Sequence, residues 1–336
     1  MSREVAVIGA GSWGTALASV LARNGHATTL WAREEEVARS IMEAHRNPVY
    51  LPEVELPAAL RASSDLARVV RSAGVVVSVV PSQFVGAVMA EAVPHLAPEA
   101  LVVSASKGIE INSLRRMDQV MDDVLSADQM ARFSVLSGPS FAAEVAREAP
   151  TAVVVASRDQ ESARSVQHLF QNRSFRVYTN PDVVGVELGG ALKNVVALGA
   201  GVAAGLGFGH NTRAALITRG LAEMTRLGVA MGARRDTFSG LAGMGDLVLT
   251  CTGDLSRNRT VGFRLGQGES LESILGEMRA VAEGVKTAEA VVELARRHEV
   301  EMPIASEVHA ILVQGRSPRE ALDNLMSRDP KPEQWS

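Results

Sequence analysis

Short apolar runs rich in branched residues recur through the first half of the chain and predict β-strands. The first, VAVIG at residues 5–9, contains no polar side chain, which is typical of a strand that helices cover on both faces. Comparable runs begin at residues 27, 75, 101, 133, 151 and 175: ATTLWA, VVVSVV, LVVSAS, FSVLSG, TAVVVAS and FRVYTN. Helical patterns separate most of them. The alternation predicts an α/β domain with a largely parallel sheet, whose ligands bind at the carboxyl ends of the strands.

The pattern changes near residue 181, after which strand patterns all but disappear. Helical patterns with capping residues replace them at residues 212–231, 256–267, 287–299, 303–314 and 318–326. We therefore predict an α/β domain over residues 1–181, an all-helical domain over residues 182–328 and a frayed polar tail over residues 329–336.

Composition limits the partners of these domains. The chain has 336 residues, 46% of them apolar, and a net charge of −4, which describes a soluble protein without the basic surface that binds nucleic acid. Its single cysteine, Cys251, excludes an internal disulfide and a cysteine-based zinc site. No signal peptide is expected, because Glu4 and a strand follow the start almost at once. Polar residues such as Glu187 and Lys193 interrupt the most apolar runs, so we expect no membrane span and a cytoplasmic location.

The first strand leads into GAGSWG, a G-x-G-x-x-G motif formed by Gly9, Gly11 and Gly14. The motif alone is weak evidence, but here it follows a strand, opens a helix and lies at the start of the predicted fold. Its glycines permit a tight turn and a close approach of the backbone to a pyrophosphate at the helix N-terminus. This context favours a Rossmann-type dinucleotide-binding loop over a tight turn without a ligand.

The second predicted strand ends in LWARE, with Arg33 near the position where an NAD enzyme would carry an acidic residue and Glu34 beyond it. An arginine here suits the 2′-phosphate of NADP, and a solvated surface arginine is the alternative. We expect NADP to be preferred and NAD to remain usable.

Polar loops follow three later strands: PSQ at residues 81–83, SKG at residues 106–108 and SGPS at residues 137–140. Lys107 comes directly after a buried strand and before a glycine. Its charge is therefore expected to point at the cofactor crevice, although an ordinary surface loop charge is the alternative.

Lys193 lies in the middle of VELGGALKNVVALGAG, a predicted helix of small and apolar residues. Its same-face neighbours are Gly189, Gly190, Val196 and Ala197, so this helix supplies no ion-pair partner. The chain uses four lysines among its 34 Lys and Arg residues, and lysine, unlike arginine, exchanges its proton when its pKa shifts. We weigh an acid–base lysine against one whose stem lies on apolar surface with its ammonium in water.

A lone carboxylate, Asp246, lies in the apolar run GLAGMGDLVLTCTG, and pairing with Lys193 would hold the lysine in place and set its pKa. The motif SRNR follows at residues 256–259. Ser256 suits a helix cap, and the first helical amides together with Arg257 and Asn258 would form an anion site. An ordinary capped helix with exposed arginines is the alternative for SRNR.

Taken together, the motifs resemble those of the bacterial-type NAD(P)-dependent glycerol-3-phosphate dehydrogenases. The resemblance covers nearly the whole chain and rests on GAGSWGTA, VPSQ, SASKGIE, SGPSFAAEV, ELGGALKNVVALGAG, LAGMGDLVLTCTG, SRNRTVG and AEGVKTA, in this order. It implies an oxidoreductase that reduces dihydroxyacetone phosphate to sn-glycerol 3-phosphate, the backbone precursor of phospholipids. Similar proteins are commonly homodimers.

The resemblance also implies roles for individual residues. Lys193 would be the proton donor and acceptor, and Asp246 and Lys107 complete the expected catalytic group. The expected dinucleotide contacts are, besides the glycine loop, Ser12, Trp13, Arg33, Lys107, Ala142, Arg257, Val281 and Glu283. The expected substrate contacts are Lys107, Gly138, Ser140, Lys193, Asp246, Ser256, Arg257 and Asn258.

Two other functions fit parts of the pattern. A hydroxyacid dehydrogenase of similar build would bind a carboxylate at SRNR, and a panel of substrates separates it from a phosphate-specific enzyme. A redox sensor would need the glycine loop but not Lys193 paired with Asp246, and the chain shows no DNA-binding or partner motif. The complete acid–base machinery favours an enzyme.

Overall fold

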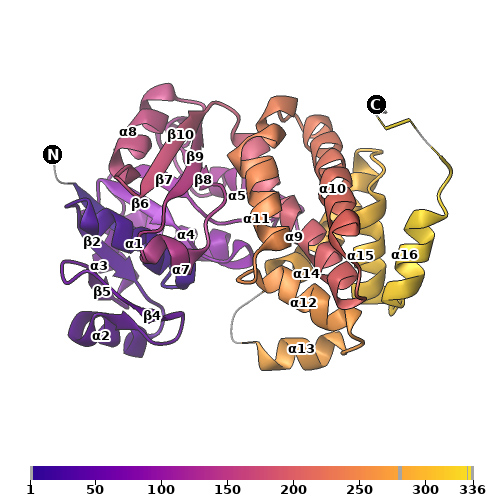
Figure 1. The fold of residues 1–336 in the computed structure, drawn as a ribbon. Helices are drawn as coiled ribbons and strands as arrows, with labels where there is room; N and C mark the ends of the chain where they lie inside the picture. The colour runs from indigo at the N-terminus through magenta and orange to yellow at the C-terminus, as the bar shows by residue number, and fades with distance from the viewer. Residues whose placement is uncertain (1–2, 279–281, 331, 334–336) are drawn as a thin grey trace. The chain divides into compact units, whose positions relative to one another are not determined.

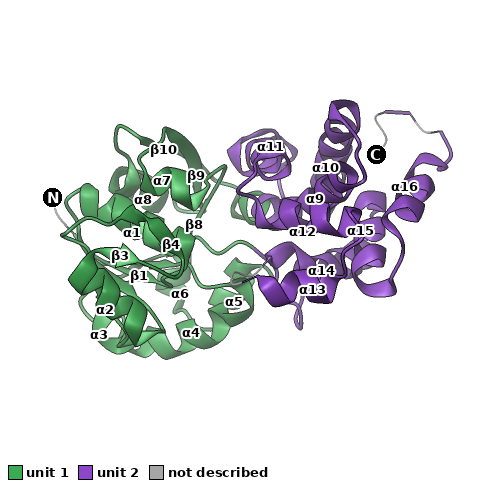
Figure 2. Cartoon of the chain, turned by 60° about the horizontal axis from the view of Figure 1, so that its bottom comes forward, with its two compact units in different colours: residues 1–107, 115–187 green, residues 108–114, 188–336 purple. Residues whose placement is uncertain are grey.

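The computed structural model describes residues 3–278, 282–330 and 332–333 (Figure 1). The chain divides into two compact units, one of residues 1–107 and 115–187 and the other of residues 108–114 and 188–336 (Figure 2). The predicted tail from residue 329 lies partly outside the described residues.

The division between the units falls after Glu187, inside helix α9 (Val183–Gly205), a few residues beyond residue 181. The sequence pattern marks the end of the last strand, at Asn180. The first turn of α9 still belongs to the first unit, because Glu187 Oε1 accepts a hydrogen bond of 2.9 Å from Asp118 N in that unit. A long-range bond of this kind has no local sequence pattern.

The first unit is built on an eight-stranded sheet in the order β10-β9-β8-β7-β6-β1-β2-β5. Its strands are β1 (Glu4–Ile8), β2 (Ala27–Trp31), β5 (Arg61–Ser63), β6 (Val75–Ser78), β7 (Leu101–Ser104), β8 (Ser134–Ser137), β9 (Thr151–Ser157) and β10 (Phe175–Asn180). Neighbouring strands are parallel except β8 and β9, which pair antiparallel. The predicted Rossmann-type α/β domain is confirmed.

A small second sheet, of β3 (Arg46–Asn47) and β4 (Leu51–Glu55), was not predicted. The segment of β4 reads LPEVE, and its proline and two acidic residues hide the strand from a pattern search. Strand β5, with the sequence RAS, is shorter still and also polar.

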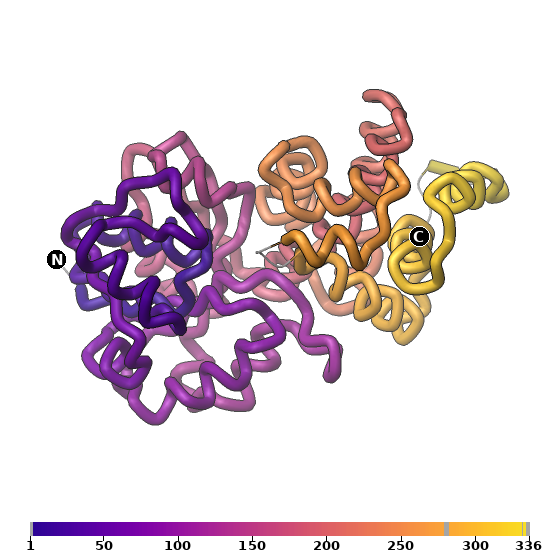
Figure 3. The backbone as a smooth tube through the Cα atoms, turned by 90° about the horizontal axis from the view of Figure 1, so that it is seen from below, coloured from indigo at the N-terminus to yellow at the C-terminus, as the bar shows by residue number. Residues whose placement is uncertain are grey.

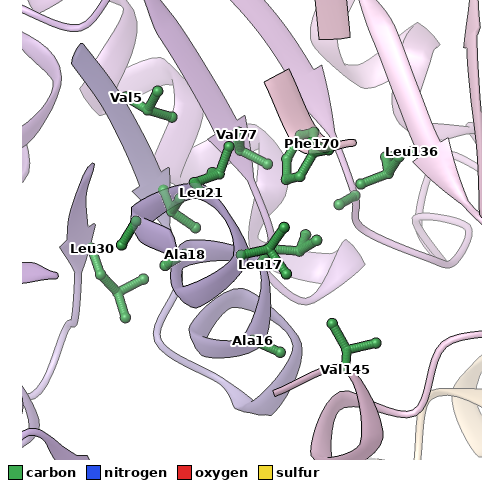
Figure 4. Close-up of a cluster of buried hydrophobic side chains, with 14 of the residues drawn as sticks. Val5, Ala16, Leu17, Ala18, Leu21, Leu30, Val77, Leu136, Val145 and Phe170 are labelled. Atoms are coloured by element: carbon green, nitrogen blue, oxygen red, sulfur yellow. The ribbon is translucent and has the colours of Figure 1, made fainter. Parts of the chain in front are cut away.

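Helices connect the strands of the first unit. They are α1 (Ser12–Arg23), α2 (Glu35–Ala44), α3 (Leu66–Val70), α4 (Val85–Ala92), α5 (Met117–Asp122), α6 (Ala127–Ala131), α7 (Ala142–Ala146) and α8 (Gln160–Phe170). Leu17 and Leu21 of α1 lie in one buried cluster with Val77 of β6 and Phe170 of α8 (Figure 4). Each such side chain contributes about 1.5–3 kcal/mol when fully buried, and the cluster fixes α1 on the sheet.

In the second unit, the elements within the described residues are all helical, as predicted. They are α9, α10 (His210–Ala230), α11 (Asp246–Thr252), α12 (Arg257–Gly266), α13 (Leu271–Glu277), α14 (Glu283–Arg297), α15 (Pro303–Gln314) and α16 (Pro318–Met326). Two shorter helical segments, Arg235–Ser239 and the π-helix Leu241–Gly245, precede α11. In Figure 3 the last helices of this unit are the yellow part of the backbone.

Helix α9 is long and apolar enough to cross a membrane, but 89% of its most apolar window is buried inside the protein. The glycines of α9 allow neighbouring segments to pack closely against this helix. A Cβ added at Gly189 would lie 2.5 Å from Ala242 O, and one added at Gly199 would lie 3.2 Å from a side-chain carbon of Val308. These contacts are those of a core helix.

Helices α9 and α12 pack backbone against backbone through glycines on both. A Cβ added at Gly201 of α9 would lie 2.1 Å from Arg259 O, and one at Gly262 of α12 would lie 2.0 Å from Leu198 O. Since real Cβ atoms do not approach so closely, small residues are required at these crossings. The packing holds the start of α12 against α9.

Gly262→Ala is therefore expected to lower the free energy of unfolding by about 1–3 kcal/mol, the usual cost of overpacking. Gly276→Ala is the matched control, because in the described structure a Cβ at this α13 position would meet nothing within 4 Å. It should be neutral or stabilising, since alanine favours a helix over glycine. Urea denaturation of both variants checks the prediction, and equal losses would contradict the packing argument.

Candidate functional site

The glycine loop of the first unit joins β1 to α1. Gly9 has a φ of +114°, a conformation that suits glycine. A Cβ on Gly14 would lie 1.8 Å from Gly9 O, so the loop closes only with glycine at this position. Within the described residues, no side chain caps the N-terminus of α1 and its first turn holds no acid. The first amides of α1 are thus placed to receive an anion.

Ser12 and Trp13 are the first two residues of α1. Ser12 Oγ donates a hydrogen bond of 2.6 Å to Tyr50 O. The indole Nε1 of Trp13 is buried and has no hydrogen-bond partner in the part of the chain described. A buried donor of this kind costs free energy unless it is satisfied.

The loops after β7 and β8 converge as expected for adjacent strand ends. Lys107 Nζ donates a hydrogen bond of 3.0 Å to Gly138 O, and Ser140 Oγ donates one of 3.1 Å to the same oxygen. Gly138 has a φ of +135°. Ala142 starts α7 directly after this turn and is packed, half-buried, against the core.

Arg33 follows β2 and is largely solvated, with 78% of its side chain exposed. Its Nη2 lies 3.2 Å from Glu34 Oε1, and the same oxygen accepts a hydrogen bond of 3.4 Å from Tyr50 Oη. Burial, and then the charge of Glu34, raise the pKa of Tyr50. The geometry is compatible with both a 2′-phosphate contact and a surface arginine.

Lys193 and Asp246 form a buried ion pair in the second unit. Lys193 Nζ lies 2.7 Å from Asp246 Oδ1, and the two residues are 6% and 1% exposed. Lys193 Nζ also donates a hydrogen bond of 2.8 Å to Thr250 Oγ1, which in turn donates one of 2.6 Å to Asp246 O. Two oxygens therefore fix the position of the ammonium.

Thr250 was missed by the sequence reasoning. It lies four residues after Asp246 on α11, and this helical spacing places both side chains on one face. This four-residue spacing could have indicated Thr250 from the sequence. It was not used because no helix was predicted in the glycine-rich run that contains α11.

Cys251 follows Thr250 on α11 and is buried. Burial, as the main cause, raises the pKa of its thiol to about 12. The thiolate is the reactive form of cysteine, and this shift disfavours it at neutral pH.

Ser256 caps α12, as predicted, by accepting a hydrogen bond of 3.2 Å from Arg259 N. Arg257, the first residue of the helix, is exposed. Asn258 is buried, and its Oδ1 accepts a hydrogen bond of 3.0 Å from Gly284 N. The sequence pointed to Asn258 as an anion contact only, whereas its oxygen also joins α12 to the start of α14.

The start of α14 is packed closely on this region. A Cβ at Gly284 would lie 2.7 Å from both Asn194 O and Asn258 Oδ1. Glu283, a predicted cofactor residue, is the first residue of α14 and is half-buried. Val281, predicted with it, lies outside the described residues.

Comparison with known proteins accounts for both units. Residues 4–163 match the N-terminal family of NAD-dependent glycerol-3-phosphate dehydrogenase, and residues 182–323 match the corresponding C-terminal family. The chain is 58% identical over 335 residues to a glycerol-3-phosphate dehydrogenase [NAD(P)+] of Geobacter sulfurreducens, and the match covers 100% of both chains.

The fold gives the same result. A crystal structure of glycerol-3-phosphate dehydrogenase from Coxiella burnetii has a TM-score of 0.92 and 38% identity, and the match covers 97% of this chain and 99% of that one. A glycerol-3-phosphate dehydrogenase from Saccharomyces cerevisiae has a TM-score of 0.82 and 29% identity, with coverage of 96% and 99%. The chain belongs to the family of NAD-dependent glycerol-3-phosphate dehydrogenases.

Proposed function

We propose that this protein catalyses the reversible NAD(P)H-dependent reduction of dihydroxyacetone phosphate to sn-glycerol 3-phosphate, which feeds phospholipid synthesis. Membership of the family supports this activity. The observation that carries it is the buried ammonium of Lys193, held by Asp246 and Thr250. A carbonyl reduction needs such a proton donor, whereas a protein that only senses the cofactor does not.

The glycine loop fits a dinucleotide. The turn at Gly9 closes tightly because Gly14 has no Cβ, and the uncapped start of α1 presents backbone amides to a pyrophosphate. We assign Ser12, Trp13 and Arg33 to the same cofactor, with Ala142, Arg257, Val281 and Glu283 as the further contacts. When bound, the reduced cofactor supplies the hydride for the carbonyl carbon of the substrate.

Lys193 acts as general acid in the direction of reduction. Its ammonium polarises the carbonyl and gives a proton to the oxygen as negative charge develops there, and in reverse the neutral amine removes that proton. Asp246 favours the charged form of the lysine, and Thr250 fixes its direction. Lys107, hydrogen-bonded to the turn at Gly138, is assigned to the substrate together with Gly138 and Ser140.

The start of α12 holds the phosphate of the substrate in this proposal. Ser256 shapes the helix end, Arg257 supplies an exposed guanidinium and Asn258 is fixed by its bond to Gly284. Guanidinium–phosphate contacts are charge-assisted and directional. Binding the phosphate at a distance from the reacting carbon orients the carbonyl.

A panel of carbonyl substrates with NADPH tests this assignment. Dihydroxyacetone phosphate should be reduced with a far higher kcat/KM than a 2-oxo acid of similar size. If a 2-oxo acid is the better substrate, the protein is a hydroxyacid dehydrogenase. If NADPH binds but no substrate is reduced, the protein is a redox sensor and not an enzyme. We further propose a cytoplasmic homodimer, on the resemblance and composition given above.

Arg33→Asp is expected to lower the preference for NADPH over NADH. A charge-assisted contact to the 2′-phosphate stabilises the complex by about 1.5–3 kcal/mol, which is about one to two decades in affinity. Glu34 offsets part of this gain, because its carboxylate lies 3.2 Å from the guanidinium. The measurement is the ratio of kcat/KM for the two cofactors.

Arg39→Asp is the control for this ratio, since Arg39 is a nearby exposed arginine that pairs with Glu35 on α2. It makes the same change of charge and should leave the ratio unaltered. If Arg33→Asp also leaves the ratio of kcat/KM values unaltered, Arg33 does not contact the 2′-phosphate.

A further inference from the structure

Asn47 lies at the centre of a buried hydrogen-bond network behind the glycine loop. Its side chain is fully buried at 0% exposure. Its Nδ2 donates hydrogen bonds of 2.8 Å to Ala10 O and 2.9 Å to Thr15 Oγ1, and its Oδ1 accepts one of 3.0 Å from Tyr50 N. One side chain thus joins the β3–β4 segment to both ends of the turn that begins α1.

The bond to Ala10 fixes the direction of the next amide. Ala10 O also accepts a hydrogen bond of 3.2 Å from Thr15 Oγ1, so two donors hold this carbonyl toward the interior. In a trans peptide unit the C=O of one residue and the N–H of the next point in opposite directions. Holding Ala10 O inward therefore turns the Gly11 N–H away from the interior, as an anion-binding loop requires.

A second bond holds the other side of the loop to the same segment. Ser12 Oγ donates a hydrogen bond of 2.6 Å to Tyr50 O. The backbone N–H of the same tyrosine donates to Asn47 Oδ1. Residues 47–50 therefore contact the loop before and after Gly11. Without these contacts the glycines would allow the loop many other conformations.

We propose that Asn47 is a positioning residue for the cofactor, which acts through Ala10 and Thr15 and holds the glycine loop in its phosphate-accepting form. It does not touch the dinucleotide itself. The proposal rests on the use of NAD(P) by this family and is independent of the assignment of the substrate.

Asn47→Asp tests the proposal with a nearly isosteric change. An ionised aspartate still accepts from Tyr50 N, but it cannot donate to Ala10 O and its charge faces that carbonyl. The Kd for NADPH and for NADH should both rise about ten- to hundred-fold, because a loop that is no longer held by these bonds must be ordered again when the cofactor binds. The kcat at saturating cofactor should change by less than about threefold, because Lys193 is untouched.

Asn172→Asp is the matched control in the same unit. Asn172 Nδ2 donates to Asn24 Oδ1 at 2.9 Å, and its Oδ1 accepts from Ser174 N and Phe175 N. The substitution removes a donor and keeps the acceptors, as at position 47, but away from the glycine loop. It should lower the unfolding temperature and leave both cofactor Kd values unchanged.

Thr15→Val provides a second test in case Asn47→Asp folds poorly. It removes the hydroxyl that accepts from Asn47 Nδ2 and donates to Ala10 O, and it should weaken both cofactors in the same direction by a smaller factor. The proposal is overturned if the cofactor Kd values stay at wild type in a folded variant at either position. It is also overturned if Asn172→Asp weakens cofactor binding as much as Asn47→Asp.

Discussion

Lys193→Arg is expected to lower kcat by ~10²–10⁴-fold, the contribution of a positioned general acid. The variant keeps a positive charge opposite Asp246, which lies 2.7 Å from Lys193 Nζ. Arginine does not release its proton at neutral pH, so the charge remains while proton transfer is lost. The Kd for NADPH should stay close to wild type, because the lysine is assigned to the carbonyl and not to the dinucleotide.

Lys286→Arg is the matched control, since Lys286 is an exposed lysine on α14. It should retain wild-type kcat. Lys193→Ala is less informative, because it leaves the buried carboxylate of Asp246 without its cation, which costs about 3–5 kcal/mol. Steady-state kinetics beside an unfolding curve separates the two effects, and near-normal turnover in Lys193→Arg would remove the lysine from its proposed role.

Arg257→Ala should raise the KM for dihydroxyacetone phosphate by about 10- to 10²-fold, because a charge-assisted contact to phosphate is worth about 1.5–3 kcal/mol. The unphosphorylated analogue dihydroxyacetone should be a poor substrate for wild type and change little further. Comparing kcat/KM for the two substrates isolates the contribution of the phosphate.

The control for Arg257 is Arg319→Ala. Arg319 is likewise exposed in the first turn of a serine-capped helix, because Ser317 Oγ accepts from Glu320 N at the start of α16. Its loss should leave both substrates unaffected. If Arg257→Ala impairs both substrates equally, the arginine serves the fold or the cofactor rather than the phosphate.

The sequence predicted the features that have a local pattern. The strands that form the centre of the sheet are continuous apolar runs, and the turn at Gly9 and Gly14 has its own glycine spacing. Lys193 and Asp246 were matched across 53 residues because each was a lone charge in an apolar run. Burial of one charge requires another nearby.

Features that depend on long-range contacts could not be predicted in the same way. Asn47 lies before a proline in a segment that reads as a turn, and its bonds to Ala10 and Thr15 cross 37 and 32 residues. Asn258 was recognised as a polar residue at a helix start, but its bond to Gly284 depends on the packing of α12 against α14. Such contacts follow from the fold and leave no periodicity in the chain.

The central claim is tested most directly by incubating the purified protein with NADPH and dihydroxyacetone phosphate. The loss of reduced nicotinamide absorbance is followed, and the product is identified by its configuration. We expect NADPH to disappear in step with the formation of sn-glycerol 3-phosphate in equal amounts, and Lys193→Arg to slow both by the same ~10²–10⁴-fold factor. Oxidation of NADPH without that product, or near-normal product formation by the variant, would contradict the account.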